Sequence, residues 1–173
     1  MAIYALGDVE PRIDPTAYVH PDAVVIGDVE LGPESSIWPS AVLRGDPGGI
    51  VIGARTSIQD GTVIHTTPIT PTRVGSDCVI GHLVHLEGCV IGNGSLVGSG
   101  AIVLNGAVVE EEALVAAGAL VSGSMVVPSR AMAMGVPAKL KLDAVDPEHH
   151  IQMGVAVYRE RGRTYREQLR RLD

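Results

Sequence analysis

Phenylalanine is absent from this chain of 173 residues, and aromatic residues make up only 3% of it. Without large rings, the core has to be filled by small and branched aliphatic side chains. Such side chains suit many thin layers better than one thick core. The 21 glycines and 11 prolines indicate frequent turns between those layers.

Positive charge is also scarce, because 13 lysines and arginines face 20 aspartates and glutamates and leave a net charge of −7. This balance argues against a nucleic-acid or anionic-membrane partner, since either needs a basic surface.

No apolar run reaches the length of a membrane span, and the first residues, MAIYALGDVEPRIDP, lack the basic and long apolar regions of a secretory signal. The only two cysteines, Cys78 and Cys89, have no CxxC spacing, which indicates free thiols in a reducing compartment. We therefore expect a cytoplasmic protein.

What the chain does contain is a short repeat, in which an aliphatic residue returns every six, sometimes five, positions and is often followed by glycine. The repeat runs through Ile26, Leu31, Ile37, Leu43, Ile52, Ile58, Ile64, Val74, Ile80, Leu86, Ile91, Val97, Val103, Val109, Val115 and Val121. This period fits neither a helix nor a long alternating strand, and it is too short for a β-sandwich, whose strands repeat about every 8–12 residues. It fits a short strand and a tight turn, with three such units closing one triangular coil and the aliphatic side chains buried inside the stack.

The end of the chain follows a different pattern, and we place a boundary between a coil domain, residues 1–137, and a linker and C-terminal α-helix, residues 138–173. The apolar positions of this helix are Ile151, Val155, Tyr158, Tyr165, Leu169 and Leu172. Gly154 and Gly162 weaken the helix, so we expect a break near Gly162.

Stacking of the coils predicts which polar residues share a face. Three repeat steps complete one coil, so Arg44, His65 and Glu87, which follow stacked aliphatic positions, are predicted to form one outward column. Neighbouring strands lie about 4.8 Å apart, which lets His65 and Glu87 share one metal ion. His82 lies on a different face of the coil, so it reaches that ion only from a neighbouring protomer. The pattern therefore favours a homotrimer with a catalytic zinc site between protomers.

Four stretches carry a resemblance to a known family. They are SIWPSAVLRGD (36–46), SIQDGTVIH (57–65), IGHLVHLEGCVIGNG (80–94) and MGVPAK (134–139). In combination they resemble the γ-class carbonic anhydrases, members of the hexapeptide-repeat proteins. The resemblance implies an all-β fold, a left-handed parallel β-helix, assembled as a homotrimer around Zn²⁺, with Fe²⁺ or Co²⁺ as replacements.

The resemblance also implies roles for single residues. His65 and His82 would bind the metal, and Gln59 would orient the metal-bound water. Arg44, Asp46 and Asp60 would form an ion-pair network at the trimer interface, where Arg44 and Asp46 would also steady bicarbonate.

Tyr158 is a candidate for reaching over the site from the tail helix. The alternative is that Tyr158 packs the helix against the coil.

The third histidine of the family is replaced by Glu87, which leaves three interpretations open. Glu87 is itself the third ligand, and a carboxylate then makes the metal a weaker Lewis acid. In the second interpretation, His85 substitutes, with Glu87 as its hydrogen-bonding partner, although it lies one residue pair, roughly 6.6 Å, along the strand. In the third, the metal site is degraded and only the trimeric scaffold survives.

The expected function is therefore hydration of CO₂ to bicarbonate by a metal-bound hydroxide, a carbonic anhydrase-like lyase activity that Glu87 would weaken. The alternatives are a non-catalytic trimeric scaffold, a metal-dependent thioesterase, and a hexapeptide acyltransferase that uses a histidine base and coenzyme A. Against the acyltransferase, the coil sequence shows no basic patch for the phosphates of the coenzyme.

Overall fold

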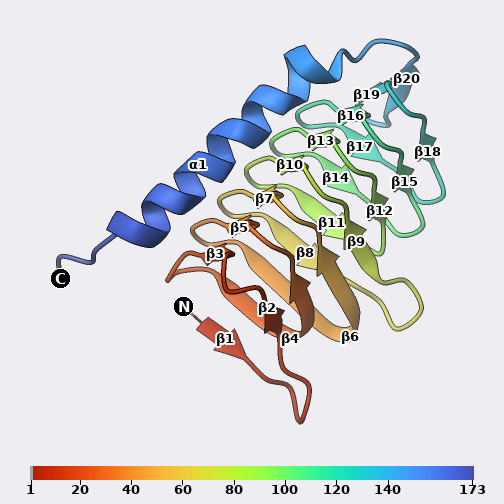
Figure 1. Cartoon of the computed structure of the whole chain (residues 1–173). Helices are drawn as coiled ribbons and strands as arrows, with labels where there is room; N and C mark the ends of the chain where they lie inside the picture. Colours follow the sequence, from red (N-terminus) through yellow and green to blue (C-terminus); the bar gives the residue numbers. More distant parts are fainter. Residues whose placement is uncertain (1) are drawn as a thin grey trace.

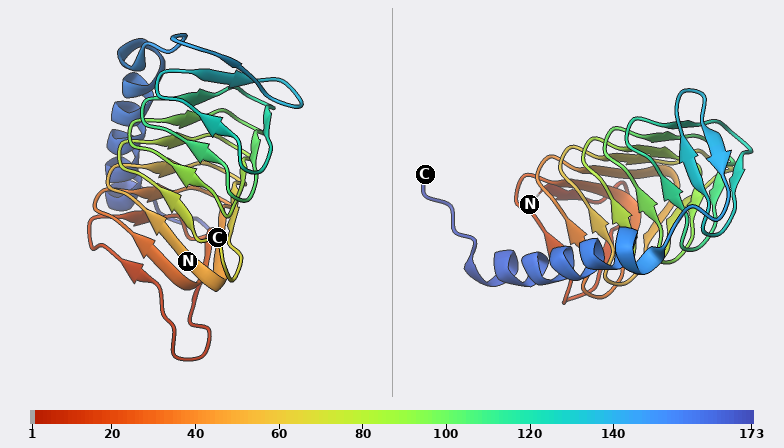
Figure 2. Two further views of the ribbon diagram at one scale, coloured as in Figure 1. Left: turned by 90° about the vertical axis from the view of Figure 1, so that its right-hand side faces the viewer. Right: turned by 90° about the horizontal axis from the view of Figure 1, so that it is seen from above.

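The computed structural model describes residues 2–173 and shows a left-handed parallel β-helix of about seven turns with one C-terminal helix. Each coil contributes one short strand to each of three faces, and the coils stack along one axis (Figures 1 and 2). This is the fold that the six-residue repeat and the family resemblance predicted.

The strands of the three faces have the following bounds. The first face consists of β1 (Ala2–Tyr4), the first parts of β4 (Val24–Leu31) and β6 (Val42–Ile52), β8 (Val63–His65), β11 (His85–Glu87), β14 (Ile102–Val103) and β17 (Leu120–Val121). The second face consists of β2 (Arg12–Ile13), the last parts of β4 and β6, β9 (Thr72–Val74), β12 (Val90–Ile91), β15 (Val108–Val109) and β18 (Val126–Val127). The third face consists of β3 (Tyr18–Val19), β5 (Ser36–Ile37), β7 (Ser57–Ile58), β10 (Val79–Ile80), β13 (Leu96–Val97), β16 (Leu114–Val115), β19 (Met132–Met134) and β20 (Lys139–Lys141).

The core is one continuous column of aliphatic side chains inside the coils. Leu43 pairs with Ile64, and Ile64 with Leu86, and all three side chains are fully buried. The first coil differs from the predicted repeat, because Val25 pairs with Leu43 while Ile26 pairs with Arg44. Three aliphatic residues follow one another there, so the sequence alone did not decide which of them points inward.

Glycine after the aliphatic position allows the coils to approach closely. A Cβ atom at Gly53 would lie 2.5 Å from the backbone of Gly75, a distance that no side chain tolerates. The positive φ angle falls two residues later, at Arg55, where φ is 57°. The glycine of the repeat is therefore required by packing between backbones, and the turn itself accepts larger residues.

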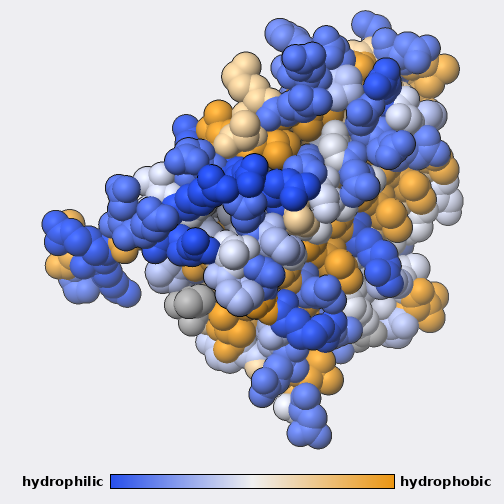
Figure 3. Space-filling model, in the orientation of Figure 1, coloured by the Kyte–Doolittle hydropathy of each residue, from blue (hydrophilic) through white to orange (hydrophobic). Residues whose placement is uncertain are grey.

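The C-terminal helix α1 (Met153–Gln168) continues the π-helical turn η1 (Glu148–Gln152) and lies along the third face (Figure 1). The expected break near Gly162 does not occur. Gly162 is buried against Ser36, so its lack of a side chain lets the helix lie close to the coil. Hydrophilic side chains run along the exposed side of α1, whereas hydrophobic ones are scattered over the uncovered coil (Figure 3).

The predicted boundary between residues 137 and 138 stays a prediction. Strand β20 lies beyond it and still pairs, antiparallel, with β19 of the coil. Across residues 2–173, no helix is long and apolar enough to cross a membrane. The cytoplasmic location also stays a prediction.

Candidate functional site

The predicted outward column lies on the first face of the coil. Arg44 pairs with His65, and His65 pairs with Glu87, in the register of three adjacent parallel strands. His65 and Glu87 therefore lie next to each other within one chain, as the stacking of the repeat predicted.

Hydrogen bonds join this column to two further side chains. Asp46 accepts hydrogen bonds from Arg44 and from His65, whose Nε2 atom lies 3.1 Å from Asp46 Oδ1. Glu87 lies between two histidines, with Oε1 4.0 Å from His65 Nδ1 and Oε2 3.2 Å from His85 Nε2. Desolvation raises the pKa of Asp46, but the hydrogen bonds from Arg44 and His65 outweigh it and leave this pKa below its ordinary value. Both ring nitrogens of His65 thus face carboxylates.

A second pair of polar residues lies at the corner between the third and first faces. His82 Nδ1 is 2.9 Å from Asp60 Oδ2, and the two side chains are about half exposed, at 45% and 46%. The residues are 22 positions apart, which is one coil, so the repeat already placed them side by side. The family resemblance implied an interface ion-pair network for Asp60, and this contact with His82 was not predicted.

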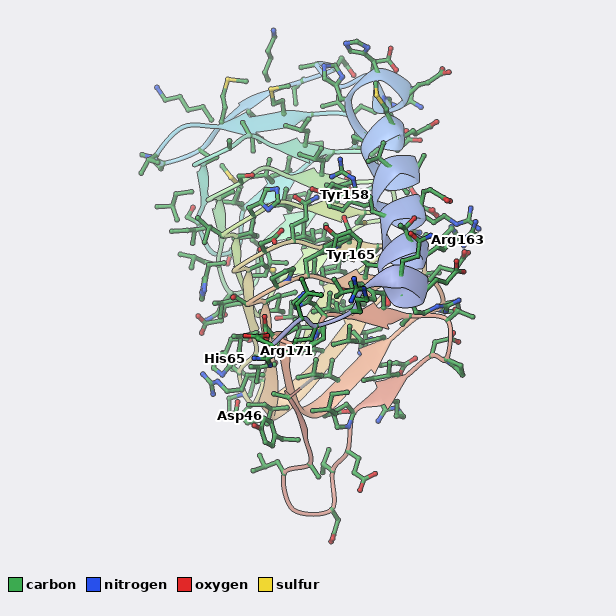
Figure 4. The ribbon with its side chains drawn as sticks, turned by 90° about the vertical axis from the view of Figure 1, so that its left-hand side faces the viewer. Asp46, His65, Tyr158, Arg163, Tyr165 and Arg171 are labelled. Atoms are coloured by element: carbon green, nitrogen blue, oxygen red, sulfur yellow. The ribbon has the colours of Figure 1, made fainter. Side chains whose placement is uncertain are left out.

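Gln59 and Tyr158 lie apart from the column. Gln59 is buried, with 4% of its surface exposed, and its backbone N–H donates to Ile80 in the next coil. The ring of Tyr158 packs edge-on against Trp38, with 5.4 Å between the ring centroids. Figure 4 shows Tyr158 beside the helix, whereas His65 and Asp46 lie together at another edge of the coil.

A metal ion does not fit the candidate ligands of a single chain. Among residues 2–173, no group of three histidine, cysteine, aspartate or glutamate side chains is placed to hold one. His65 and Glu87 are adjacent, but His82 is turned toward Asp60 at the corner. A zinc site built from His65, His82 and Glu87, or from His85 in place of Glu87, requires a second chain and stays a prediction.

Comparisons with known proteins place the chain in a family. A family model described as bacterial transferase hexapeptide (six repeats) matches residues 71–105. The carnitine operon protein CaiE of Citrobacter koseri is 43% identical over 150 residues, which are 87% of this chain and 76% of CaiE. CaiE of Escherichia coli O157:H7 is equally similar.

Two solved structures have nearly the same fold over nearly the whole chain. A hexapeptide transferase family protein from Anaplasma phagocytophilum has a TM-score of 0.90 and 37% identity and covers 95% of this chain and 98% of its own. A putative acetyltransferase from Bacillus cereus has a TM-score of 0.93 and 35% identity, and covers 97% of this chain and 98% of its own.

These relatives correct the expected activity. The solved structures are described as transferases, and the matching family model is one of bacterial transferases. The predicted carbonic anhydrase-like lyase is therefore wrong, although the resemblance behind it predicted the fold correctly. By its similarity to CaiE over 87% of its length, the chain belongs to the family of hexapeptide-repeat proteins that contains the carnitine operon protein CaiE.

Proposed function

We propose that the protein is an acyltransferase that moves an acyl group from an acyl-coenzyme A thioester to an amine or hydroxyl acceptor. The observation that carries this proposal is the pair formed by His82 and Asp60, with 2.9 Å between His82 Nδ1 and Asp60 Oδ2. A carboxylate at this distance holds the imidazole proton on Nδ1 and leaves Nε2 as a proton acceptor. The half-exposed corner position makes Nε2 accessible to a substrate.

In the proposed reaction, His82 acts as a general base. Nε2 takes the proton of the acceptor as its nitrogen or oxygen attacks the thioester carbonyl. The carbon–sulfur bond then breaks, and the thiolate of coenzyme A leaves and takes the proton from His82. Asp60 stabilises the imidazolium that exists between the two proton transfers.

The corner above His82 provides room for an extended acyl donor such as a coenzyme A thioester. Gly100 and Gly118 follow His82 in the next two coils, and a Cβ atom at either would meet no atom within 4 Å. The strip from His82 to the β19–β20 hairpin spans three coils, which is about 14 Å. At its end, Lys139 and Lys141 are exposed and supply the positive charge that the phosphates of a coenzyme need. Strand β20 thus supplies the basic residues at the end of this strip.

The names of the relatives support the same reaction class, because one solved structure is described as a putative acetyltransferase. Proteins of this fold are typically trimers, and we include a homotrimer in the proposal. In such a trimer, the His82 corner of one copy would meet the first face of the next. No step of the proposed reaction passes through a metal ion.

The test is an assay of free thiol released from acetyl-coenzyme A in the presence of amine and hydroxyl acceptors. We expect acceptor-dependent release, which His82→Ala lowers by about 100- to 10,000-fold, the usual contribution of general base catalysis. Asp60→Asn is expected to lower the release as well, because the imidazole then loses the carboxylate that orients it. His150→Ala is the matched control, because His150 is an exposed histidine at the start of the helical segment.

Added chelator separates this mechanism from a metal-dependent thioesterase, since only the thioesterase would lose activity. Full activity of His82→Ala, or no release with any acceptor, would contradict the proposal. A protein without any release would then remain as the non-catalytic scaffold.

A further inference from the structure

The corner that carries His82 has one turn position with a positive φ angle in each of five successive coils. This corner column consists of Ser40, Gly61, Leu83, Gly100 and Gly118. Their φ angles lie between 56° and 68°, the left-handed region that glycine adopts freely and that strains other residues. Leu83 is the one large side chain in this column, and it follows His82 directly in the chain.

The folding of a single chain gives no reason for a leucine at this position. Leu83 is 72% exposed, so it buries little apolar surface. Its backbone N–H donates to the carbonyl of Asp60 at 2.9 Å, a hydrogen bond that glycine would form equally well. A large apolar residue that is held in a strained conformation without stabilising the core indicates a role outside folding.

The side chain of Leu83 lies along the corner, over Gly61 of the preceding coil. A Cβ atom at Gly61 would lie 2.7 Å from Leu83 Cδ2 and 3.7 Å from Leu83 Cγ. Of the described atoms beyond its chain neighbours, it would meet no other within 4 Å. On the other side of Leu83, a Cβ atom at Gly100 or Gly118 would meet no described atom within that distance. Leu83 therefore interrupts a strip that the glycines otherwise leave free of side chains.

The position of this interruption matters for an acyl donor. In the proposed reaction, coenzyme A reaches His82 along Gly118 and Gly100, from the end of the coil that carries Lys139. The thioester carbon then lies at His82, and the acyl chain continues in the opposite direction. An acetyl group ends there, whereas a longer acyl group has to pass the side chain of Leu83 to reach Gly61.

We propose that Leu83 limits the length of the acyl group by blocking the strip just beyond His82. This inference rests on the proposed acyltransferase function and deepens it, because it assigns the protein to short acyl donors such as acetyl-coenzyme A. Without the leucine side chain, the strip would extend by one coil of about 4.8 Å, the length of about four methylene groups. The bonds that break and form are the same for every acyl length.

The test is a calorimetric titration of the full chain with acetyl-coenzyme A and with hexanoyl-coenzyme A, in the absence of an acceptor. The hexanoyl group is longer by the four methylene groups that would fill the strip over Gly61. We expect the parent chain to bind hexanoyl-coenzyme A at least about tenfold more weakly, the discrimination that a pocket achieves against a single methylene group. The thiol-release assay is expected to show the same preference in kcat/KM.

Two variants remove the block. Leu83→Ala deletes Cγ and both Cδ atoms but keeps the Cβ atom, and it is expected to bring the affinities for the two donors within about threefold of each other. Leu83→Gly is expected to do the same with a residue that suits the φ angle of 56°. Leu172→Ala is the matched control, because Leu172 is an exposed leucine of the tail beyond α1, and it is expected to keep the parent preference.

An unchanged preference in Leu83→Ala and Leu83→Gly would overturn the proposal. Loss of assembly in Leu83→Ala, measured by light scattering, would overturn it too, because the leucine would then be a contact between copies. A shifted binding preference without any thiol release would overturn the acyltransferase function and leave the role of Leu83 in binding standing. Failure of the parent chain to bind either donor would overturn both.

Discussion

Glu34 joins the coil to the helix through two arginines that lie 125 and 129 positions later in the chain. Arg159 and Arg163 both donate to its carboxylate. These hydrogen bonds, that of Arg159 first, lower the pKa of Glu34 to about 2. Arg166 adds a hydrogen bond of 2.8 Å to the backbone oxygen of Thr16. The arginines at the end of the chain thus fasten the helix to the coil.

Acid is expected to weaken this attachment. The folded-state pKa of Glu34 lies below the ordinary glutamate value of about 4.3. The stabilisation is therefore complete above about pH 4.5 and is lost as the pH falls toward 2. The fluorescence of Trp38, the single tryptophan, reports the change, because Tyr158 and Tyr165 of the helix pack on its ring.

Glu34→Gln is expected to remove the part of this pH dependence that belongs to the attachment and to weaken docking at neutral pH. Glu160→Gln serves as control, since Glu160 is exposed and contacts Arg163 only at 3.8 Å. An acid transition that is the same in Glu34→Gln and in the parent chain would contradict the assignment.

At the scale of elements, contact between α1 and the third face depends on the two glycines of the helix. A Cβ atom at Gly162 would lie 3.4 Å from Ser36 Cβ, and one at Gly154 would lie 3.3 Å from Val79 Cγ2. Glycine lowers helix propensity by about 1 kcal/mol relative to alanine. Here that loss is offset by the closer packing of the helix on flat coils, with Trp38 held between the helix tyrosines.

Gly162→Leu is expected to destabilise the protein by about 1–3 kcal/mol, because a branched side chain has no space between helix and coil. Urea unfolding followed by circular dichroism measures the change. Glu160→Leu, at an exposed position two residues away, is expected to stay within about 0.5 kcal/mol of the parent chain. Equal stability of Gly162→Leu and Glu160→Leu would show that Gly162 is not needed for close approach.

At the scale of the whole molecule, metal binding depends on how copies assemble. One chain brings His65 and Glu87 together but holds His82 at a different corner. Glu87 is also engaged by His85, at 3.2 Å. Both contacts have to rearrange before Glu87 takes part in a site shared between chains.

Glu87→His is therefore expected to retain more zinc than the parent chain when both are purified without chelator. The variant offers a neutral imidazole in place of a carboxylate that is held by His85. Elemental analysis gives the metal content, and light scattering gives the number of chains in the assembly. About one zinc per chain in the parent protein would contradict this expectation and assign Glu87 or His85 as a working third ligand.

Much of the architecture was predictable because parallel stacking converts a period in the sequence into contact in space. The repeat placed Arg44, His65 and Glu87 in one column, and the register of the strands confirms that placement. The same rule could have found the pair of Asp60 and His82, which are one coil apart. The inward-pointing residue of the first coil was not predicted correctly. The consecutive aliphatic residues around Val25 show no alternation of apolar and polar positions, so the sequence does not indicate which of them is buried.

The sequence by itself therefore determined the coil, its aliphatic core and the backbone neighbours of each polar residue, since all three follow from a repeat of fixed length. Only the tertiary structure decided which partner each side chain takes. It turned His82 toward Asp60, set Glu87 between His65 and His85, and brought Arg159 to Glu34. The physical reason is that a repeat fixes the positions of Cα atoms, whereas ion pairs and helix docking depend on side-chain rotamers and on groups far apart in the chain.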